Sequence, residues 1–267
     1  MSQRVVLVTG ASSGIGKSTA SLLAEKGFRV FGTSRKPQRE RDGGFELVPL
    51  DVQSDTSVLQ CVSGVIAKAG RVDILVNNAG NVLTGAIEET SIEEAKAHFE
   101  TDFFGAARMV NAVLPDMRKR KNGVIINISS MATNFPVPFE GYYAAAKTAL
   151  LAFSDALRQE VRNFNIRVSV VEPGFFRTNL QNARIRTAKS IEDYGATETR
   201  VLSRLEESFE GGGDPRTVAE TIERIIETQS PAFRYAVGKE KQYLTAKRIL
   251  PASLIESLAR RHWGLDQ

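Results

Sequence analysis

Short apolar runs alternate along the chain with longer segments of helical period, and this alternation limits the fold more than any other feature. Several of the runs, such as VVLV and VSVV, are apolar at every position. This is typical of strands in a parallel sheet that is buried on both faces. The strand-like runs cover residues 4–8, 29–33, 46–50, 73–76, 123–128 and 167–171, and the helical segments cover residues 15–26, 55–69, 92–118 and 142–163. The alternation predicts an α/β fold with an open, doubly wound parallel sheet.

The regular alternation weakens after Gly174. Residues 178–214 are polar and charged, end in three glycines and carry no strong strand signal. An excursion of this length inside a compact domain is usually a lid or binding segment, so we expect it to cover a substrate. Residues 215–229 are helical in period, and a short strand-like FRYAV follows. No linker or internal repeat divides the sequence, which favours a single domain over residues 1–267.

The C-terminal tail, residues 239–267, is basic and amphipathic and is interrupted by Pro251. A basic amphipathic segment can lie on an anionic membrane. Proline argues against one continuous helix of that kind. We therefore expect a pair of short helices that cover a substrate pocket or form a subunit contact.

Composition excludes several classes of protein. The chain is 42% hydrophobic and 25% charged, as ordinary globular proteins are. Its 35 basic and 31 acidic residues give a net charge of +4, too small for nucleic-acid binding over the whole surface. One cysteine and two histidines build neither an internal disulfide nor a zinc cluster. Neither a secretory signal nor an apolar run of about 20 residues is evident, so we expect a cytoplasmic protein without a metal or a membrane partner.

A glycine-rich loop lies between the first strand-like run and the first helical segment. Glycines there permit a tight turn and let backbone N–H groups approach a pyrophosphate at the positive end of the helix. The spacing is G-x-x-x-G-x-G, and the alternative is a plain tight turn. The position between strand and helix predicts a Rossmann-type dinucleotide site, whose candidate residues are Gly10, Ser12, Ser13, Gly14, Ile15 and Gly16.

The end of the second strand indicates which dinucleotide binds. NAD sites place an acid there for the ribose hydroxyls, whereas NADP sites place arginine there for the 2′-phosphate. This strand ends in Ser34, Arg35 and Lys36, and the first acid that follows is Glu40. The pattern favours NADP(H), and the alternative is a solvated basic loop.

Tyr143 and Lys147 lie four residues apart at the start of a predicted helix, so they share one face. An ammonium beside a phenol favours the phenolate. Such a tyrosine can give or take the hydroxyl proton of an alcohol–ketone pair. Taken alone the pair carries little weight, because similar pairs occur by chance on solvated helices.

Five motifs in order make the pair specific. The sequence contains Thr9-Gly10-x-x-x-Gly14-Ile15-Gly16, Asn77-Asn78-Ala79-Gly80, Ser130, Tyr143-x-x-x-Lys147 and Pro173-Gly174-x-x-x-Thr178. In these motifs the chain resembles the short-chain dehydrogenase/reductase family over residues 4–178. The FRYAV and Leu250-Pro251 region looks like the hydroxysteroid and retinol dehydrogenase-like branch.

The resemblance implies a role for each matching residue. Ser130 would hold the substrate oxygen, Tyr143 would transfer the proton, and Lys147 would bind the nicotinamide ribose and support the phenolate. The remaining implied cofactor contacts are Asp51 and Val52 at the adenine, Asn78, Ala79 and Gly80 on the adenosine side, and Pro173, Gly174, Phe176 and Thr178 at the nicotinamide. The resemblance also implies a homodimer or homotetramer formed through the helices at 92–118 and 142–163.

One position departs from the family pattern. The family usually has asparagine in Asn-x-x-Gly, where it helps to hold a water for the proton relay, and this chain has Asp102-Phe103-Phe104-Gly105. An ionised carboxylate accepts hydrogen bonds but cannot donate them. Its charge would favour protonated Lys147 and partly offset the effect of Lys147 on Tyr143. Asp102 therefore has either a relay role or a structural one.

The sequence as a whole predicts an NADP(H)-dependent oxidoreductase that interconverts a ketone or aldehyde and an alcohol by hydride transfer. The apolar residues 135–139 between Ser130 and Tyr143 predict a pocket wall and hence a hydrophobic small-molecule substrate. The alternative, motivated by Asp102, is an NADP-binding regulatory protein with weakened catalysis. His98 is expected to be an ordinary packed or exposed helix residue, and Cys61 a small buried one.

Overall fold

The computed structural model describes residues 3–37, 41–178 and 184–266, and it contains an eight-stranded sheet. The strand order is β10-β8-β7-β5-β1-β2-β4-β3, and every pairing is parallel except that of β3. The predicted doubly wound parallel sheet is confirmed. The bounds are β1 Val5–Val8, β2 Arg29–Ser34, β3 Arg41–Asp42, β4 Phe45–Pro49, β5 Ile74–Asn77, β7 Gly123–Ile128, β8 Ile166–Pro173 and β10 Arg234–Val237.

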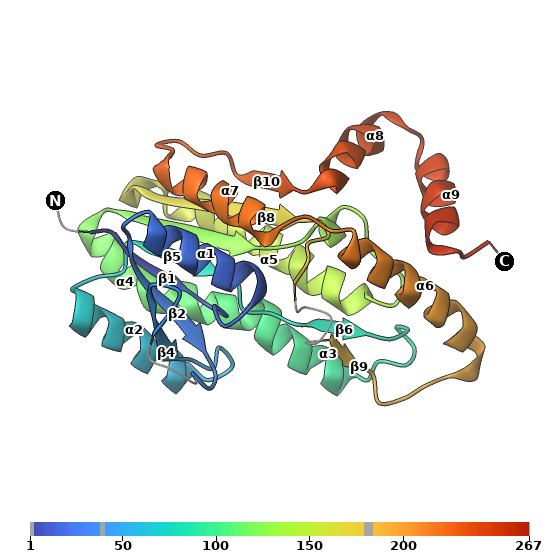
Figure 1. Ribbon diagram of the computed structural model, residues 1–267, viewed down its shortest axis with the longest axis horizontal. Coiled ribbons are helices and arrows are strands. Elements are labelled where there is room, and N and C mark those ends of the chain that lie inside the picture. The colour runs from blue at the N-terminus through green and yellow to red at the C-terminus, as the bar shows by residue number, and fades with distance from the viewer. Residues whose placement is uncertain (1–2, 38–40, 179–183, 267) are drawn as a thin grey trace.

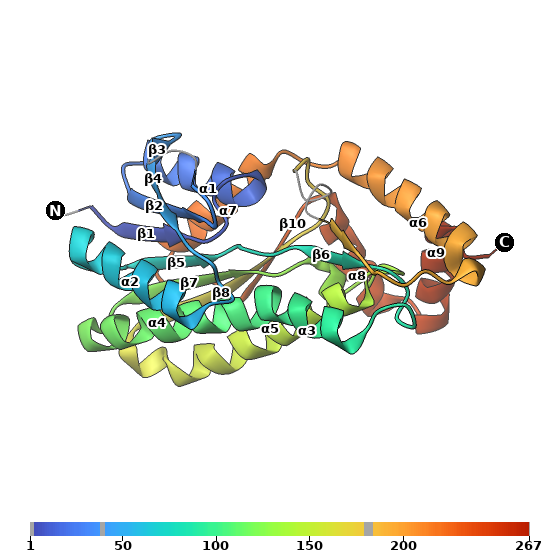
Figure 2. The ribbon, with the colours of Figure 1, turned by 90° about the horizontal axis from the view of Figure 1, so that it is seen from below.

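Helices cover both faces of the sheet, as Figure 2 shows. One face packs against α1 (Gly14–Glu25) and α7 (Pro215–Glu227), and the other against α2 (Asp55–Ala69), α4 (Gly105–Arg120) and α5 (Gly141–Glu160). Alternate residues of each strand point to opposite faces. In β1, Val5 and Leu7 belong to one core and Val6 and Val8 to the other. This is why the strands are apolar at every position.

The carboxyl ends of the central strands meet at one edge of the sheet. β1 has its neighbours β2 and β5 on opposite sides, and their crossovers run to opposite faces (Figure 1). A crevice forms at such a switch point in doubly wound sheets, and ligands bind there. The glycine loop after β1, the Asn77 motif at the end of β5 and Ser130 after β7 all lie at this edge.

The helix predicted over 92–118 is divided in the structure. α3 (Ile92–Phe99) is followed by the π-helical turn η1 (Glu100–Phe104) and then by α4. Ser91 begins α3 with a capping box, because its hydroxyl accepts from the Glu94 N–H while the Glu94 carboxylate accepts from the Ser91 N–H. π-Helical turns widen a helix locally and are frequent at functional sites. This turn contains Asp102.

The C-terminal third differs from the expectation in one element. A small parallel sheet pairs β6 (Val82–Thr84) with β9 (Arg184–Arg186), whereas no strand was expected in residues 178–214. The pairing joins segments about 100 residues apart, and three residues are too few to show a strand pattern in sequence. α6 (Glu192–Glu210) follows, and residues 179–183 lie outside the described residues.

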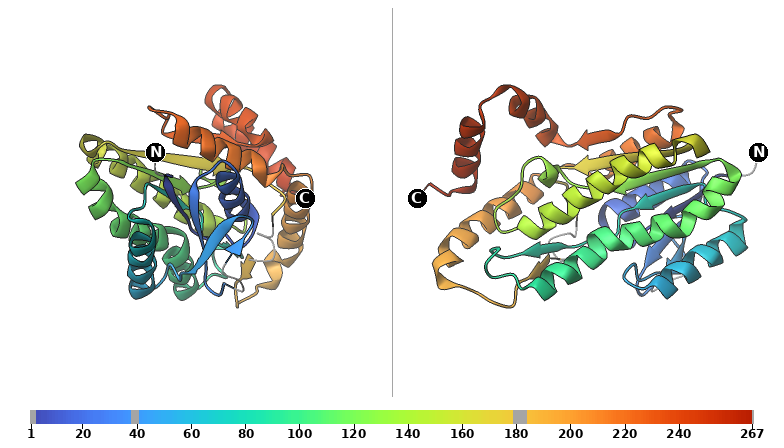
Figure 3. Two further views of the ribbon diagram at one scale, coloured as in Figure 1. Left: turned by 60° about the vertical axis from the view of Figure 1, so that its left-hand side comes forward. Right: turned by 180° about the vertical axis from the view of Figure 1, so that it is seen from behind.

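The tail forms the expected pair of short helices, α8 (Tyr243–Ile249) and α9 (Ala252–Trp263), which meet at Pro251. They extend from the sheet as an arm beside α6 (Figure 3). Trp263 closes the arm onto α6 by packing against Val201, Leu202 and Leu205. None of the helices in the described residues is long and apolar enough to span a bilayer.

Candidate active site

A cavity of about 1400 Å³ opens at the carboxyl edge of the sheet. Its walls come from the glycine loop, the ends of β2, β5, β7 and β8, the start of α5, and parts of β9, α6, α8 and α9. The predicted site residues that line it are Gly10, Ser12, Ser13, Gly14, Ile15, Ser34, Arg35, Lys36, Asp51, Val52, Asn78, Ala79, Gly80, Asp102, Ser130, Tyr143, Lys147, Pro173, Gly174, Phe176 and Thr178. Gly16 is the predicted site residue that lies behind this wall. The folded chain thus brings the separate motifs together.

The glycines of the loop are required by close backbone packing. Gly10 has a φ of +66°, and a Cβ there would lie 2.9 Å from the Ala79 Cα. A Cβ on Gly16 would overlap the Gly10 carbonyl oxygen and the Asn78 side-chain amide. These contacts bring the loop against the segment after β5 and leave its outer side to the cavity.

Hydrogen bonds of Asn78 and Thr9 join the glycine loop to the segment after β5. The Asn78 side-chain amide donates to the carbonyl oxygens of Thr9 (2.9 Å) and Gly10 (3.1 Å). In return the Thr9 hydroxyl accepts from the backbone N–H groups of Asn78 and Ala79, both at 2.9 Å. Loop carbonyls that would otherwise need water are satisfied within the protein.

The start of α1 suits an anion. Ser13 precedes the helix, and its side chain makes no capping hydrogen bond to the described residues. The free N–H groups of the first turn and the helix dipole favour negative charge at this point. Arg35 and Lys36 line the same cavity at the end of β2, and both are exposed. This end of the cavity fits a phosphorylated dinucleotide.

Ser130, Tyr143 and Lys147 converge at the other end of the cavity. All three line the cavity, and the Lys147 Nζ lies 5.8 Å from the centre of the Tyr143 ring. Burial raises the pKa of Tyr143, while Lys147 and the Ser130 side chain lower it and Asp102 and Glu140 raise it further. The geometry places a proton-carrying phenol between a hydroxyl and a cation.

Asp102 contacts Lys147 directly. Its Oδ2 lies 2.9 Å from the Lys147 Nζ, and both side chains are buried. Gly80 makes room for the pair, because a Cβ there would lie 2.8 Å from the same carboxylate oxygen. Burial disfavours the Lys147 ammonium, but Asp102 and Tyr143 outweigh it and raise the pKa of Lys147 above its usual range. Asp102 therefore stands within the charge network of the site.

Comparison with known proteins agrees with this arrangement. A model of the short chain dehydrogenase family matches residues 4–189, which include the glycine loop, Ser130, Tyr143 and Lys147. The chain belongs to the short-chain dehydrogenase/reductase family. The resemblance seen in the sequence is confirmed.

Two relatives show where in the family the sequence lies. The chain is 41% identical to the 3-ketodihydrosphingosine reductase of Bacteroides thetaiotaomicron, over 92% of each chain. It is 35% identical to human retinol dehydrogenase 8, over 94% of this chain and 86% of the relative.

Two solved structures share the fold. A short-chain dehydrogenase from Streptomyces avermitilis superposes with a TM-score of 0.84 at 36% identity, covering 96% of each chain. The closed form of a serine dehydrogenase, solved with NADP⁺, superposes with a TM-score of 0.76 at 27% identity, covering 89% of this chain and 96% of the other.

His98 lies in the cavity wall at a place that the sequence did not reveal. It is packed, as one of the two expectations had it, with 2% of its surface exposed. It also lines the cavity, and its ring lies 6.1 Å from that of Tyr143. The i,i+4 spacing from Asp102 was the available signal, since it puts both side chains on one helical face.

Glu140 and Arg184 form a second buried ion pair in the cavity wall. Their side chains are 7% and 8% exposed and approach to 3.4 Å. Burial raises the pKa of Glu140 to about 7, against the opposing charge of Arg184. No sequence pattern identified this pair, because the pairing of β9 with β6 carries Arg184 to the start of α5.

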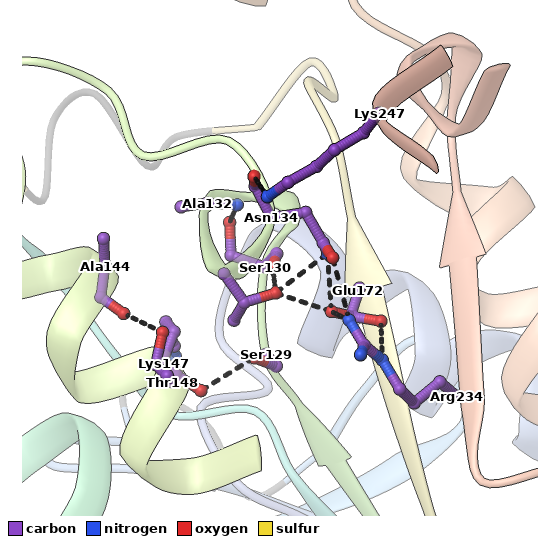
Figure 4. Close-up of polar contacts among 11 residues, drawn as sticks. Ser129, Ser130, Ala132, Asn134, Ala144, Lys147, Thr148, Glu172, Arg234 and Lys247 are labelled. Carbon is purple, nitrogen blue, oxygen red and sulfur yellow. Dashed lines mark hydrogen bonds and ion pairs between the residues drawn. The ribbon is translucent and has the colours of Figure 1, made fainter. Parts of the chain in front are cut away.

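Glu172 fixes the turn that follows Ser130 (Figure 4). Its carboxylate accepts from the Thr133 hydroxyl (2.6 Å) and the Asn134 amide (3.0 Å), and from Arg234 on β10 at 2.8 and 2.7 Å. Glu172 is 1% exposed. β8 and β10 are thereby tied to the turn that follows Ser130.

The wall beyond Tyr143 is largely apolar. Phe135 and Val137 line it as predicted, whereas residues 136, 138 and 139 are not among the described lining residues. Phe139 packs against the hydrophobic cluster that contains Val137 and Trp263. Further apolar lining residues come from segments far away in sequence, among them Leu83, Phe175, Ile185, Phe209, Leu250, Ile255, Leu258 and Trp263.

Proposed function

We propose that this protein is an NADP(H)-dependent oxidoreductase that interconverts a ketone or aldehyde and an alcohol on a hydrophobic substrate. The observation that carries the proposal is the convergence of Ser130, Tyr143 and Lys147 in a cavity whose walls also include the glycine loop and an apolar surface. This arrangement gives a substrate oxygen a hydrogen-bond partner and a proton source in one place.

The bound cofactor supplies or accepts a hydride. In reduction the Ser130 hydroxyl holds the carbonyl oxygen, and the Tyr143 phenol donates its proton to the alkoxide that forms. The positive charge of Lys147 stabilises the Tyr143 phenolate that remains after the proton transfer. In oxidation the same phenolate takes the proton of the alcohol.

NADP(H) is proposed over NAD(H) because of Arg35 and Lys36. Both are exposed at the cavity. The described residues that directly follow β2 include no acid of the kind that binds the ribose hydroxyls in NAD sites. A guanidinium binds a phosphate with charge-assisted hydrogen bonds. The serine dehydrogenase structure at 27% identity holds NADP⁺, which supports the proposal.

A long apolar substrate is proposed from the wall contributed by α6, α8 and α9. Apolar lining of this kind binds apolar groups by removing them from water. The names of the two relatives, a 3-ketodihydrosphingosine reductase and a retinol dehydrogenase, support a long-chain ketone or alcohol. A cytoplasmic location and a homodimer or homotetramer formed through the helices at 92–118 and 142–163 remain predictions.

Turnover with purified protein tests the proposal. NADPH oxidation is followed with a panel of long-chain ketones, and Tyr143→Phe is the test variant. Loss of the phenolic proton should lower the rate by about 10²–10⁴. Binding of NADPH should be unchanged, since the ring is kept. Failure of every ketone, or full activity of Tyr143→Phe, would contradict the proposal, and NADPH binding without turnover would favour a regulatory protein.

A further inference from the structure

Asn81 and His98 hold Asp102 from the side opposite Lys147. The Asn81 backbone N–H donates to the Asp102 Oδ1 at 2.9 Å, and the Asn81 side-chain oxygen lies 2.8 Å from the His98 Nδ1. The His98 Nδ1 is itself 3.9 Å from the Asp102 Oδ1. The two residues thus enclose one carboxylate oxygen while Lys147 contacts the other.

The surroundings of His98 decide which ring nitrogen carries the proton. The Asn81 side-chain oxygen can only accept, and the nearby Asp102 oxygen is negative, so both favour a proton on Nδ1. The His98 Nε2 has no hydrogen-bond partner in the part of the chain that the structure describes. The pKa of His98 lies below its ordinary value. Burial is the main cause, Asp102 opposes it and Lys147 adds to it. The ring at pH 7 is therefore neutral, with its proton on Nδ1.

We propose that His98 is a positioning residue, which acts with Asn81 to keep the Asp102 carboxylate turned to Lys147 and so sets how strongly Lys147 acts on Tyr143. The inference rests on the proposed function, in which the Tyr143 proton is the one that moves. The groups that face His98 are Asp102 on η1 and Lys147 and Tyr143 on α5.

The contacts of Asp102 determine the direction in which the pKa of Tyr143 should change when His98 is replaced. Lys147 lowers the pKa of Tyr143, and Asp102 raises it. Without the His98 N–H, the Asn81 side chain loses its partner and the nearby Asp102 carboxylate is held less firmly against Lys147. The ammonium is then less compensated, and the pKa of Tyr143 should fall. Asp102→Asn should shift it in the same direction for the same reason.

The proton position can be tested by ¹⁵N NMR of the imidazoles in the full-length protein without cofactor. The chain has two histidines, so His262→Phe assigns the remaining signals to His98. The expected result at pH 7 is a neutral ring protonated on Nδ1. A ring protonated on Nε2 would face Asp102 with a lone pair and would overturn the proposal, as would an imidazolium.

The effect on Tyr143 can be tested by ultraviolet difference titration. The chain has five tyrosines, so each protein is compared with its own Tyr143→Phe derivative. His98→Phe should raise the ratio of phenolate to phenol about twofold or more at a fixed pH, which corresponds to the lower end of couplings between contacting residues. His98→Gln keeps an N–H donor and should restore most of the wild-type titration.

The double variant separates positioning from a general loss of structure. If His98 acts through Asp102, then His98→Phe should add little to Asp102→Asn. Fully additive shifts, or an unchanged Tyr143 titration in His98→Phe, would overturn the proposal. These readouts need no substrate. A shifted titration with no ketone reduced would leave the positioning role standing and remove the proposed reaction, and the reverse outcome would remove the positioning role alone.

Discussion

The two ends of the cavity are built on different principles. At the cofactor end the loop is held by backbone contacts and by Asn78, and the charged groups, Arg35 and Lys36, are exposed. At the catalytic end the charged groups are buried in two ion pairs, Asp102 with Lys147 and Glu140 with Arg184. An exposed cation is solvated by water whether or not it has a partner. A buried cation depends on its acidic partner.

Stability and function are coupled at the catalytic end and separate at the cofactor end. Changes of charge at the cofactor end should alter binding and leave the free energy of unfolding unchanged. Changes of charge at the catalytic end should alter both stability and proton chemistry. Single substitutions at the two ends should therefore differ in their effect on stability.

The largest effect is expected for Lys147→Met. The change leaves the Asp102 carboxylate buried, with 0% of its side chain exposed, and without its cation. Removing one partner of a buried pair costs about 3–5 kcal/mol in the free energy of unfolding. Denaturant titration at pH 7 measures this loss. The double variant Asp102→Asn/Lys147→Met should recover most of the lost free energy of unfolding. If Lys147→Met were as stable as the wild type, the buried carboxylate would not depend on its cation.

Glu140→Gln should change how stability depends on pH. The pKa of Glu140 is 4.5 in its ordinary state and about 7 in the folded protein. The unfolded chain therefore loses its proton first, and the wild type loses stability as pH rises between these values. This difference in the pKa of Glu140 between the folded and unfolded chain corresponds to about 3 kcal/mol in the free energy of unfolding.

Glutamine has no proton to lose, so the variant should gain on the wild type between pH 5 and pH 8. Denaturant titrations at these two pH values give the comparison. A constant difference between the two proteins would show that Glu140 does not titrate in this range.

Arg35→Ala should weaken NADPH binding and do nothing to stability. One charge-assisted hydrogen bond to the 2′-phosphate contributes about 1.5–3 kcal/mol, which is about tenfold or more in Kd. NADH binding should change little. Arg118→Ala removes the same charge from an exposed site outside the cavity and serves as the control. Equal affinity of the wild type for NADPH and NADH would refute the assignment of the cofactor.

The contrast also explains how much could be predicted from sequence. The parallel sheet and the glycine loop follow from local patterns, because their residues are close in sequence. The charge network does not. His98 reaches Asp102 where the π-helical turn follows α3, and Arg184 reaches Glu140 because β9 pairs with β6. Both depend on contacts that a local pattern does not encode. Asp102 stood out as a departure from the family motif, but its contacts required the fold.

The central claim is that the buried Asp102 carboxylate tempers the action of Lys147 on Tyr143. Oxidation of an alcohol needs the Tyr143 phenolate, so its rate rises with pH through the phenol's pKa. Asp102→Asn removes the carboxylate charge while keeping the shape of the side chain. The deciding measurement is the pH–rate profile of alcohol oxidation for the wild type and for Asp102→Asn. We expect a lower midpoint in the variant, and superimposable profiles or a higher midpoint would show that Asp102 does not act on Tyr143 through Lys147.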